Sequence, residues 1–140
     1  MLVNTWLSCG PDERATGLSI ENKRVPSLKQ HMKELVKLVV FVPKTHSDFV
    51  REVMGKAGAG KIGNYTFCSF TTSGTGRFKP EQGANPAIGA VGKLEAVEED
   101  RIEVACEKSN VKNIIEAIKK VHPYEEVVID IYPMLVIEND

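Results

Sequence analysis

The chain has 140 residues, of which 42% are apolar and 26% are charged, and its formal net charge is −1. These values are typical of one globular domain with a core of ordinary size. A nearly neutral chain with scattered basic residues and few aromatics excludes the basic surface that binds nucleic acid or anionic membranes.

The N-terminus and the cysteines indicate the compartment. No apolar run reaches the roughly 18 residues of a transmembrane helix, and no basic segment followed by an apolar stretch marks a secretory signal. Three widely spaced cysteines without a CxxC pair indicate reduced thiols rather than a zinc ribbon or a redox dithiol. We therefore expect a cytoplasmic protein.

Residues 1–34 differ from the rest of the chain, because they combine glycine, proline and mixed charges without a sustained period. We expect an irregular, poorly ordered N-terminal extension, with Met32 as an alternative translation start. The other interpretation is an arm that packs on a neighbouring subunit through Trp6 and Leu7. Residues 35–140 then form the folded domain.

The first structural unit runs from residue 35 to residue 58. Residues 35–42 are apolar and β-branched and stop at a proline, which predicts a central strand buried on both faces. The TxxD pattern at residues 45–48 resembles a capping box. Apolar residues at helical spacing follow, and Gly58 suits the left-handed residue after a helix.

The middle of the chain is expected to be extended. Residues 64–72 alternate aromatic or apolar with small polar residues, which predicts a half-solvated strand. We expect its partner at residues 76–79, across a turn at residues 73–75. Residues 92–97 and 100–107 also read as extended, and we expect the acidic stretch from Glu95 to Asp100 to be a solvated turn between strands.

The second unit is a helix followed by a strand. Ser109 is the expected N-cap, and the apolar residues between Val111 and Val121 form a regular core stripe. Pro123 prevents the helix from continuing, and residues 127–133 predict the final strand.

The resulting order predicts an α+β, ferredoxin-like double βαβ fold. Its antiparallel sheet carries two helices on one face, with an extra glycine-rich hairpin or loop insertion in the middle. Apolar residues on both faces of the outer strands indicate that another subunit covers the open face. We therefore expect a homo-oligomer.

Three segments of the chain carry recognisable motifs: GAGKIGNY at 58–65 with CSF at 68–70, GTGRFKP at 74–80 with GANP at 83–86, and HPYEE at 122–126 with DIYP at 130–133. Together they resemble the inserted domain of the Nif-three-like (YqfO-type) family. The resemblance covers roughly residues 35–135 and implies a CutA/PII-like fold that assembles as a trimer. The family's two-metal site belongs to its flanking domains, so we expect this chain to be the inserted module alone.

The first candidate site is the glycine-rich block between residues 55 and 92, which holds nine of the eleven glycines. Bare backbone N–H groups favour an anion or nucleotide cradle, although Ile62 stands where a phosphate loop needs a hydroxyl residue. The alternative is a set of turns with tight strand packing. The candidate ligand-binding residues are Gly58, Gly60, Lys61, Gly63, Asn64, Tyr65, Arg77, Asn85 and Tyr124.

The second candidate site is the segment from His122 to Glu126. An imidazole and a carboxylate favour a divalent metal, so these two residues are the candidate metal ligands, and a divalent metal is the one cofactor that the sequence suggests. The alternative is that His122 ends the helix as a cationic imidazole. No catalytic constellation is recognisable, because Cys68 has no identifiable base nearby.

The leading hypothesis is a non-enzymatic, oligomeric sensor or binding module that holds a small ligand or a metal at a subunit interface. The first alternative is a metal-dependent hydrolase, which the family resemblance implies. The second is a structural adaptor that oligomerises a partner. Fold alone does not choose among them.

Overall fold

The computed structural model describes residues 34–135. The expected N-terminal extension and its alternative start at Met32 lie outside the described residues. Within that range, strands and helices follow the predicted βαββαβ order, with a short 3₁₀ helix before each α-helix. In chain order they are β1 (Leu35–Pro43), η2 (Lys44–His46), α1 (Ser47–Lys56), β2 (Phe70–Phe78), β3 (Glu95–Glu107), η3 (Lys108–Asn110), α2 (Val111–Lys119) and β4 (Ile129–Pro133).

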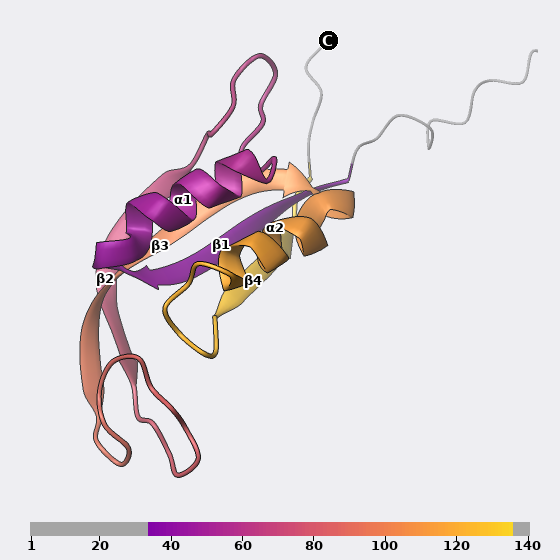
Figure 1. Cartoon of the computed structure of the whole chain (residues 1–140). Helices are drawn as coiled ribbons and strands as arrows, with labels where there is room; N and C mark the ends of the chain where they lie inside the picture. Colours follow the sequence, from indigo (N-terminus) through magenta and orange to yellow (C-terminus); the bar gives the residue numbers. More distant parts are fainter. Residues whose placement is uncertain (1–33, 136–140) are drawn as a thin grey trace, which may run out of the picture. The chain divides into compact units, whose positions relative to one another are not determined.

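The four strands form one sheet in the order β2-β3-β1-β4, with every neighbouring pair antiparallel. At the centre, Leu38 of β1 lies opposite Val104 of β3 and Ile131 of β4. The two strands of each βαβ unit are therefore parallel and separated by a strand of the other unit. Figure 1 shows both helices over one face of the sheet. The predicted ferredoxin-like α+β fold is confirmed.

Burial against the helices explains why these segments form these elements. Alternate residues of β1, from Val36 to Val42, are buried in one core with the apolar stripes of both helices, including Met54 and Ile118. That spacing of two along the strand and three to four along the helix is what the sequence pattern predicts. Among residues 34–135, neither α-helix is long and apolar enough to cross a membrane.

The face of the sheet away from the helices is less covered. On β1, Val39 is buried on this open face while Phe41 is half-buried. Towards the two edges of the sheet, Phe70, Val128 and Tyr132 leave 66%, 58% and 49% of their surface exposed. By strand register Phe70 and Tyr132 share the open face with Val39, and Val128, just before β4, accepts a backbone hydrogen bond from the neighbouring Phe41.

The prediction for residues 64–79 is wrong. One nine-residue strand, β2, runs through the expected turn, and residues 64–69 belong to the loop before it. The acidic residues are not a turn either, because β3 passes through them and places Gly74 opposite Glu99. Pairing with β3 along the whole length of β2 outweighs the local turn preference of its glycines.

The predicted helix caps are also wrong in detail. His46 and Asn110 occupy the N-cap positions without a side-chain capping bond, because a 3₁₀ turn precedes each helix. The end of α1 is as predicted: Gly58 adopts φ +94°, in the left-handed region. The side-chain amide of Asn110 donates to the carbonyl of Ala57 at 2.9 Å, which satisfies one of the free carbonyls at the helix end.

Candidate binding site

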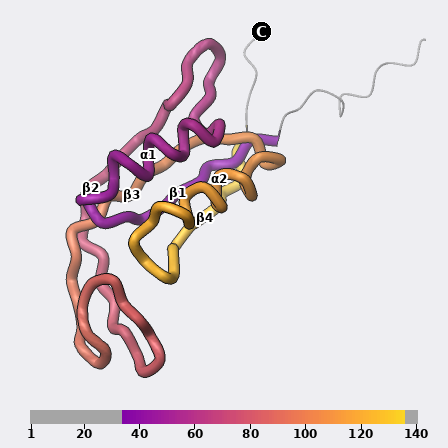
Figure 2. The backbone as a smooth tube through the Cα atoms, in the orientation of Figure 1, coloured from indigo at the N-terminus to yellow at the C-terminus, as the bar shows by residue number. Residues whose placement is uncertain are grey.

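The predicted ligand-binding residues lie at opposite ends of the sheet. Residues 58–65 precede the start of β2, whereas Arg77, Asn85 and Tyr124 lie near its end. A nine-residue strand spans about 26 Å at roughly 3.3 Å per residue. Figure 2 shows the two loops projecting at the two ends of the β2-β3 pair. One small ligand therefore does not contact both groups.

The loop of residues 60–68 is closed by its own backbone. The Gly60 N–H donates to the carbonyl of Ala105 at 2.8 Å, and the Cys68 N–H donates to the Gly60 carbonyl at 2.9 Å. At the tip, Ile62 and Tyr65 exchange two backbone hydrogen bonds of 2.9 Å. These N–H groups are already bonded, so the geometry favours turns and tight packing over an anion cradle.

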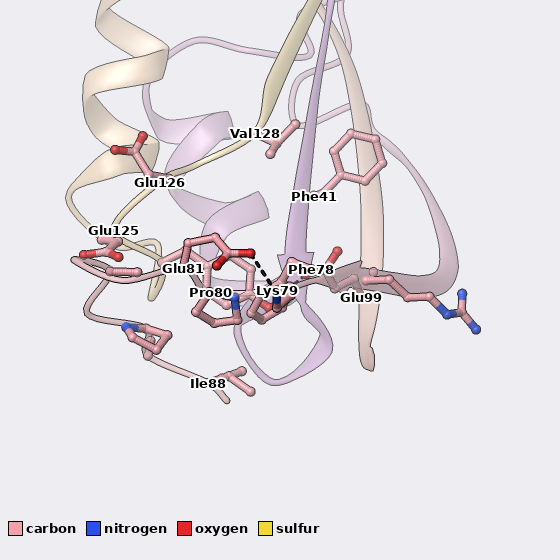
Figure 3. A pocket seen from close by; sticks show the side chains of 16 residues that line it. Phe41, Phe78, Lys79, Pro80, Glu81, Ile88, Glu99, Glu125, Glu126 and Val128 are labelled. Atoms are coloured by element: carbon pink, nitrogen blue, oxygen red, sulfur yellow. Dashed lines mark hydrogen bonds and ion pairs between the residues drawn. The ribbon is translucent and has the colours of Figure 1, made fainter. Parts of the chain in front are cut away.

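The other end of β2 borders a pocket with a volume of ≈ 580 Å³. Its floor is the open face of the sheet, where Phe41, Phe78 and Glu99 come from three different strands. Its walls are the loop that follows β2, residues 79–88, and the segment that precedes β4, residues 124–128. Figure 3 shows the labelled side chains around this hollow.

Three contacts hold the side chain of Tyr124 in the wall of the pocket, including an edge-to-face contact with the ring of His122 at a centroid distance of 5.2 Å. Its hydroxyl donates to Oε1 of Glu99 at 2.8 Å, and its ring meets the ring of Phe78 edge to face, with centroids 5.9 Å apart. Burial, together with the hydrogen bond to Glu99, raises the pKa of Tyr124 well above its ordinary value of 10.0. The hydroxyl therefore remains a protonated donor.

A glycine in β2 makes room for the Glu99 carboxylate. A Cβ atom at Gly76 would collide with the carboxylate atoms of Glu99. The missing side chain of Gly76 thus leaves the space that the Glu99 carboxylate occupies on the open face.

His122 fixes the turn that carries Tyr124. The carbonyl of Phe41 can only accept, so Nε2 of His122 donates to it at 2.9 Å. Nδ1 then accepts from the Tyr124 N–H at 3.1 Å. The side chain is buried, and this burial lowers the pKa of the imidazole below 6.5. The ring is therefore a neutral positioning group, rather than the cationic helix end that the sequence also suggests.

The two walls of the pocket are tied together by polar contacts. The backbone N–H of Asn85 donates to Oε1 of Glu125 at 2.9 Å, which links the loop after β2 to the segment before β4. Within the loop, Lys79 and Glu81 form an ion pair of 3.0 Å, drawn as a dashed line in Figure 3.

The metal assignment to His122 and Glu126 stays a prediction. Both ring nitrogens of His122 are engaged in the hydrogen bonds described above, so metal binding requires the ring to give up its Tyr124 contact. Between residues 34 and 135, no three His, Cys, Asp or Glu side chains gather in a group suited to a metal ion.

Proteins similar to this chain identify its family. A protein of Halalkalibacterium halodurans described as "GTP cyclohydrolase 1 type 2 homolog" is 55% identical over 100 residues, which cover 71% of this chain and 27% of that protein. The Bacillus subtilis protein of the same description is 53% identical over 100 residues, with the same coverage. A crystal structure of a Bacillus cereus protein related to NIF3 matches with a TM-score of 0.64 and 48% identity, covering 73% of this chain and 26% of that one. The predicted relationship to the Nif-three-like family is confirmed.

The chain spans about a quarter of the length of these Nif-three-like relatives. No protein-family model matches it. Among solved structures, the CutA protein of Archaeoglobus fulgidus, described as a periplasmic divalent cation tolerance protein, matches with a TM-score of 0.55 at 16% identity and covers 71% of this chain and 83% of that one. CutA1 of Pyrococcus horikoshii matches with a TM-score of 0.56 at 16% identity, covering 75% and 88%. At such low identity the likeness shows the fold alone, and the predicted CutA-like fold is confirmed.

Sequence reasoning finds only part of the pocket of this Nif-three-like domain. Arg77, Tyr124 and Glu126 are predicted site residues that line the pocket, whereas Asn85 lies outside the lining and contributes a backbone bond to Glu125. Phe41, Phe78 and Glu99 are missed. Their common location depends on strand register, and the only signal in the sequence is the alternation of residues along each strand.

Proposed function

We propose that this Nif-three-like domain is a non-enzymatic binding module that holds a small ligand in the pocket at the end of β2. The observation that carries the proposal is the pocket itself. Its volume of ≈ 580 Å³ lies within the roughly 300–1,000 Å³ of small-molecule sites. Such sites are mainly apolar with a few oriented polar groups, as here with Tyr124 and Glu99.

The placement of the reactive side chains supports binding rather than catalysis. His122, which borders the pocket through Tyr124, uses both ring nitrogens to hold the chain. Cys68 lies before the start of β2, about 26 Å from the pocket at 3.3 Å per residue. A thiol at that distance does not act on a ligand bound beside Tyr124.

The open face of the sheet supports self-association. Phe70, Val128 and Tyr132 are exposed there, and burying them against a second copy removes apolar surface from water at about 25 cal/mol per Å². We propose a homo-oligomer, with a trimer as the favoured state. Val128 also lines the pocket, so such an interface would place the ligand next to a subunit boundary. The free thiols of Cys68 and Cys106 support the proposed cytoplasmic location.

A blocked-pocket variant tests the proposal. Ala87 lines the pocket, so Ala87→Trp should fill it, whereas Gln82→Trp adds the same side chain to the same loop outside the lining. Thermal-shift screening of the chain with nucleotides, divalent metals and small organic molecules should yield a ligand that stabilises the native protein and the Gln82→Trp control but not Ala87→Trp. A screen without any such ligand contradicts the proposal. Light scattering that shows a concentration-independent monomer contradicts the homo-oligomer.

A second candidate is a metal-dependent hydrolase, favoured by the description of the relatives as GTP cyclohydrolase homologues. The predicted metal ligands His122 and Glu126 would serve that activity. Turnover of GTP or a phosphoester that requires a divalent metal and stops with a chelator would support the hydrolase over the binding module. If neither binding nor turnover is found, the structural adaptor becomes the better explanation.

A further inference from the structure

We propose that the ligand of this pocket is an organic cation with a flat apolar body, rather than a nucleotide or another anion. The inference rests on the proposed binding function and specifies its ligand class. It follows from three properties of the lining: its formal charge, its hydrogen-bonding capacity and its aromatic walls.

The charge of the lining is negative. Four carboxylates and two basic residues line the pocket, which gives a formal net charge of −2 at pH 7. The four carboxylates come from separate parts of the chain: Glu81 from the loop after β2, Glu99 from β3, and Glu125 and Glu126 from the segment before β4.

Of the four carboxylates, only that of Glu81 is paired with a basic residue of the lining. Lys79 is paired with Glu81 at 3.0 Å. Arg77 lies between Gly76 and Phe78 on β2, and successive side chains of a strand point to opposite faces. Because Phe78 belongs to the open face, the side chain of Arg77 belongs to the other face of the sheet.

Three hydrogen-bond donors beside the pocket already have acceptors. The Tyr124 hydroxyl donates to Glu99, the backbone N–H of Asn85 donates to Glu125, and Nε2 of His122 donates to Phe41. A ligand that offers only acceptors, such as a phosphate, therefore finds few donors here.

Acceptors, in contrast, remain available. An ionised carboxylate has about four lone-pair sites, and the bonds above use one oxygen each on Glu99 and Glu125. Glu126 is exposed and has no hydrogen bond or ion pair among residues 34–135. A ligand that complements this lining brings N–H donors and a positive charge, as a protonated amine or a guanidinium does.

The rest of the lining selects the body of the ligand. The rings of Phe41, Phe78 and Tyr124 border the pocket together with Pro80 and Ile88. Aromatic faces attract both apolar groups and cations, since the ring carries a negative face. An ammonium group attached to a flat apolar body satisfies both parts of the lining at once.

Three small probes with one phenyl ring and different charges test the ligand class. They are 2-phenylethylammonium, 2-phenylethanol and 3-phenylpropionate, and GTP serves as a nucleotide. We expect the ammonium to bind at least tenfold tighter than the carboxylate, with the alcohol between them, as measured by the ¹⁵N-amide shifts of Ala84 and Ala87. Raising the salt concentration should shrink this ratio, because ions screen the carboxylates.

A matched pair of variants locates the effect. Glu126→Gln should weaken binding of the ammonium about threefold or more while leaving the alcohol unchanged. Glu116→Gln removes the same charge from an exposed position on α2 outside the pocket, so it should bind every probe as the native chain does. Equal weakening by both variants overturns the assignment to this pocket.

The remaining outcomes separate the inference from the function on which it rests. Binding of the carboxylate or GTP as tightly as the ammonium overturns the cationic ligand but leaves the binding module standing. Absence of saturable shifts with all four probes also overturns the cationic ligand. The proposed function fails as well only if the thermal-shift screen finds no ligand that the Ala87→Trp variant loses.

Discussion

Replacing Gly60 by alanine should destabilise the protein far more than the same change at Gly63. Both glycines adopt a left-handed backbone, with φ of +71° and +54°. They differ in what a new Cβ atom would meet. At Gly63 nothing lies within 4 Å, whereas at Gly60 three backbone atoms of Cys68 lie at 3.0 Å or less. Comparing the two variants therefore separates the cost of a left-handed backbone from the cost of a steric collision.

The expected magnitudes follow from these contacts. A left-handed alanine costs roughly 1–2 kcal/mol, which is the whole effect expected for Gly63→Ala. At Gly60 the backbone of Cys68 must also move, because neither partner is a flexible side chain. That movement breaks one or both of the hydrogen bonds from Gly60 to Ala105 and from Cys68 to Gly60, each worth about 1 kcal/mol. The total for Gly60→Ala is about 3 kcal/mol.

Urea unfolding followed by far-UV circular dichroism measures the difference. The free energies of unfolding are compared at one protein concentration, because self-association changes the apparent stability. We expect Gly60→Ala to be less stable than Gly63→Ala by about 1–2 kcal/mol, from the lost hydrogen bonds. A difference below about 0.5 kcal/mol would refute the conclusion that contact between Gly60 and Cys68 closes this loop.

Three further predictions concern the pocket and the core. Because burial lowers the pKa of His122 below 6.5, the neutral ring stabilises the fold fully above that pH, and this stabilisation is lost as the pH falls from about 6.5 through the lowered pKa. Urea unfolding between pH 7.5 and 5 should show a decline in the free energy of unfolding that His122→Gln lacks. Equal declines in both proteins contradict this role of His122. Tyr124→Phe keeps the ring on Phe78 but removes the bond to Glu99, at a cost of about 1–2 kcal/mol; an unchanged unfolding midpoint would show that the bond contributes nothing. Ile118→Ala leaves a cavity in the core and should cost about 2–5 kcal/mol by the same assay, and a loss below 1 kcal/mol would contradict its full burial.

Elements with a strong hydrophobic period can be predicted from the sequence. The stripe that includes Ile114 and Ile118 predicts α2, and the β-branched run predicts β1, because burial against one core directly produces those patterns. The end of α1 is also predictable, since Gly58 adopts the left-handed conformation that few other residues tolerate.

The strand β2 shows where local reasoning fails. Gly74 and Gly76 have a strong preference for turns, yet both belong to a strand that is paired along its full length with β3. The reason for Gly76 lies in another strand, because a side chain there would collide with Glu99. Such a tertiary cause leaves no signal within a few residues of the glycine itself.

The pocket is only partly predictable for the same reason. Tyr124 can be selected because it lies in the HPYEE segment, where polar and aromatic residues cluster, but its partner Glu99 sits in an acidic stretch that suggests a solvated turn. In the sequence, Phe41 looks like any other apolar residue of a central strand, and nothing near it indicates a pocket. The site exists because strand register and the turn at His122 bring these groups together.

The distance between the two ends of β2 has a consequence for how this domain can change. About 26 Å of paired strand, at 3.3 Å per residue, separates the loop of residues 60–68 from the pocket. Substitutions that far apart with no shared partners generally have additive effects on stability. A double variant of Gly60→Ala and Tyr124→Phe should therefore lose the sum of the two single losses. The two ends of β2 therefore contribute independently to stability. Residues that line the pocket can change without compensating changes in the loop of residues 60–68.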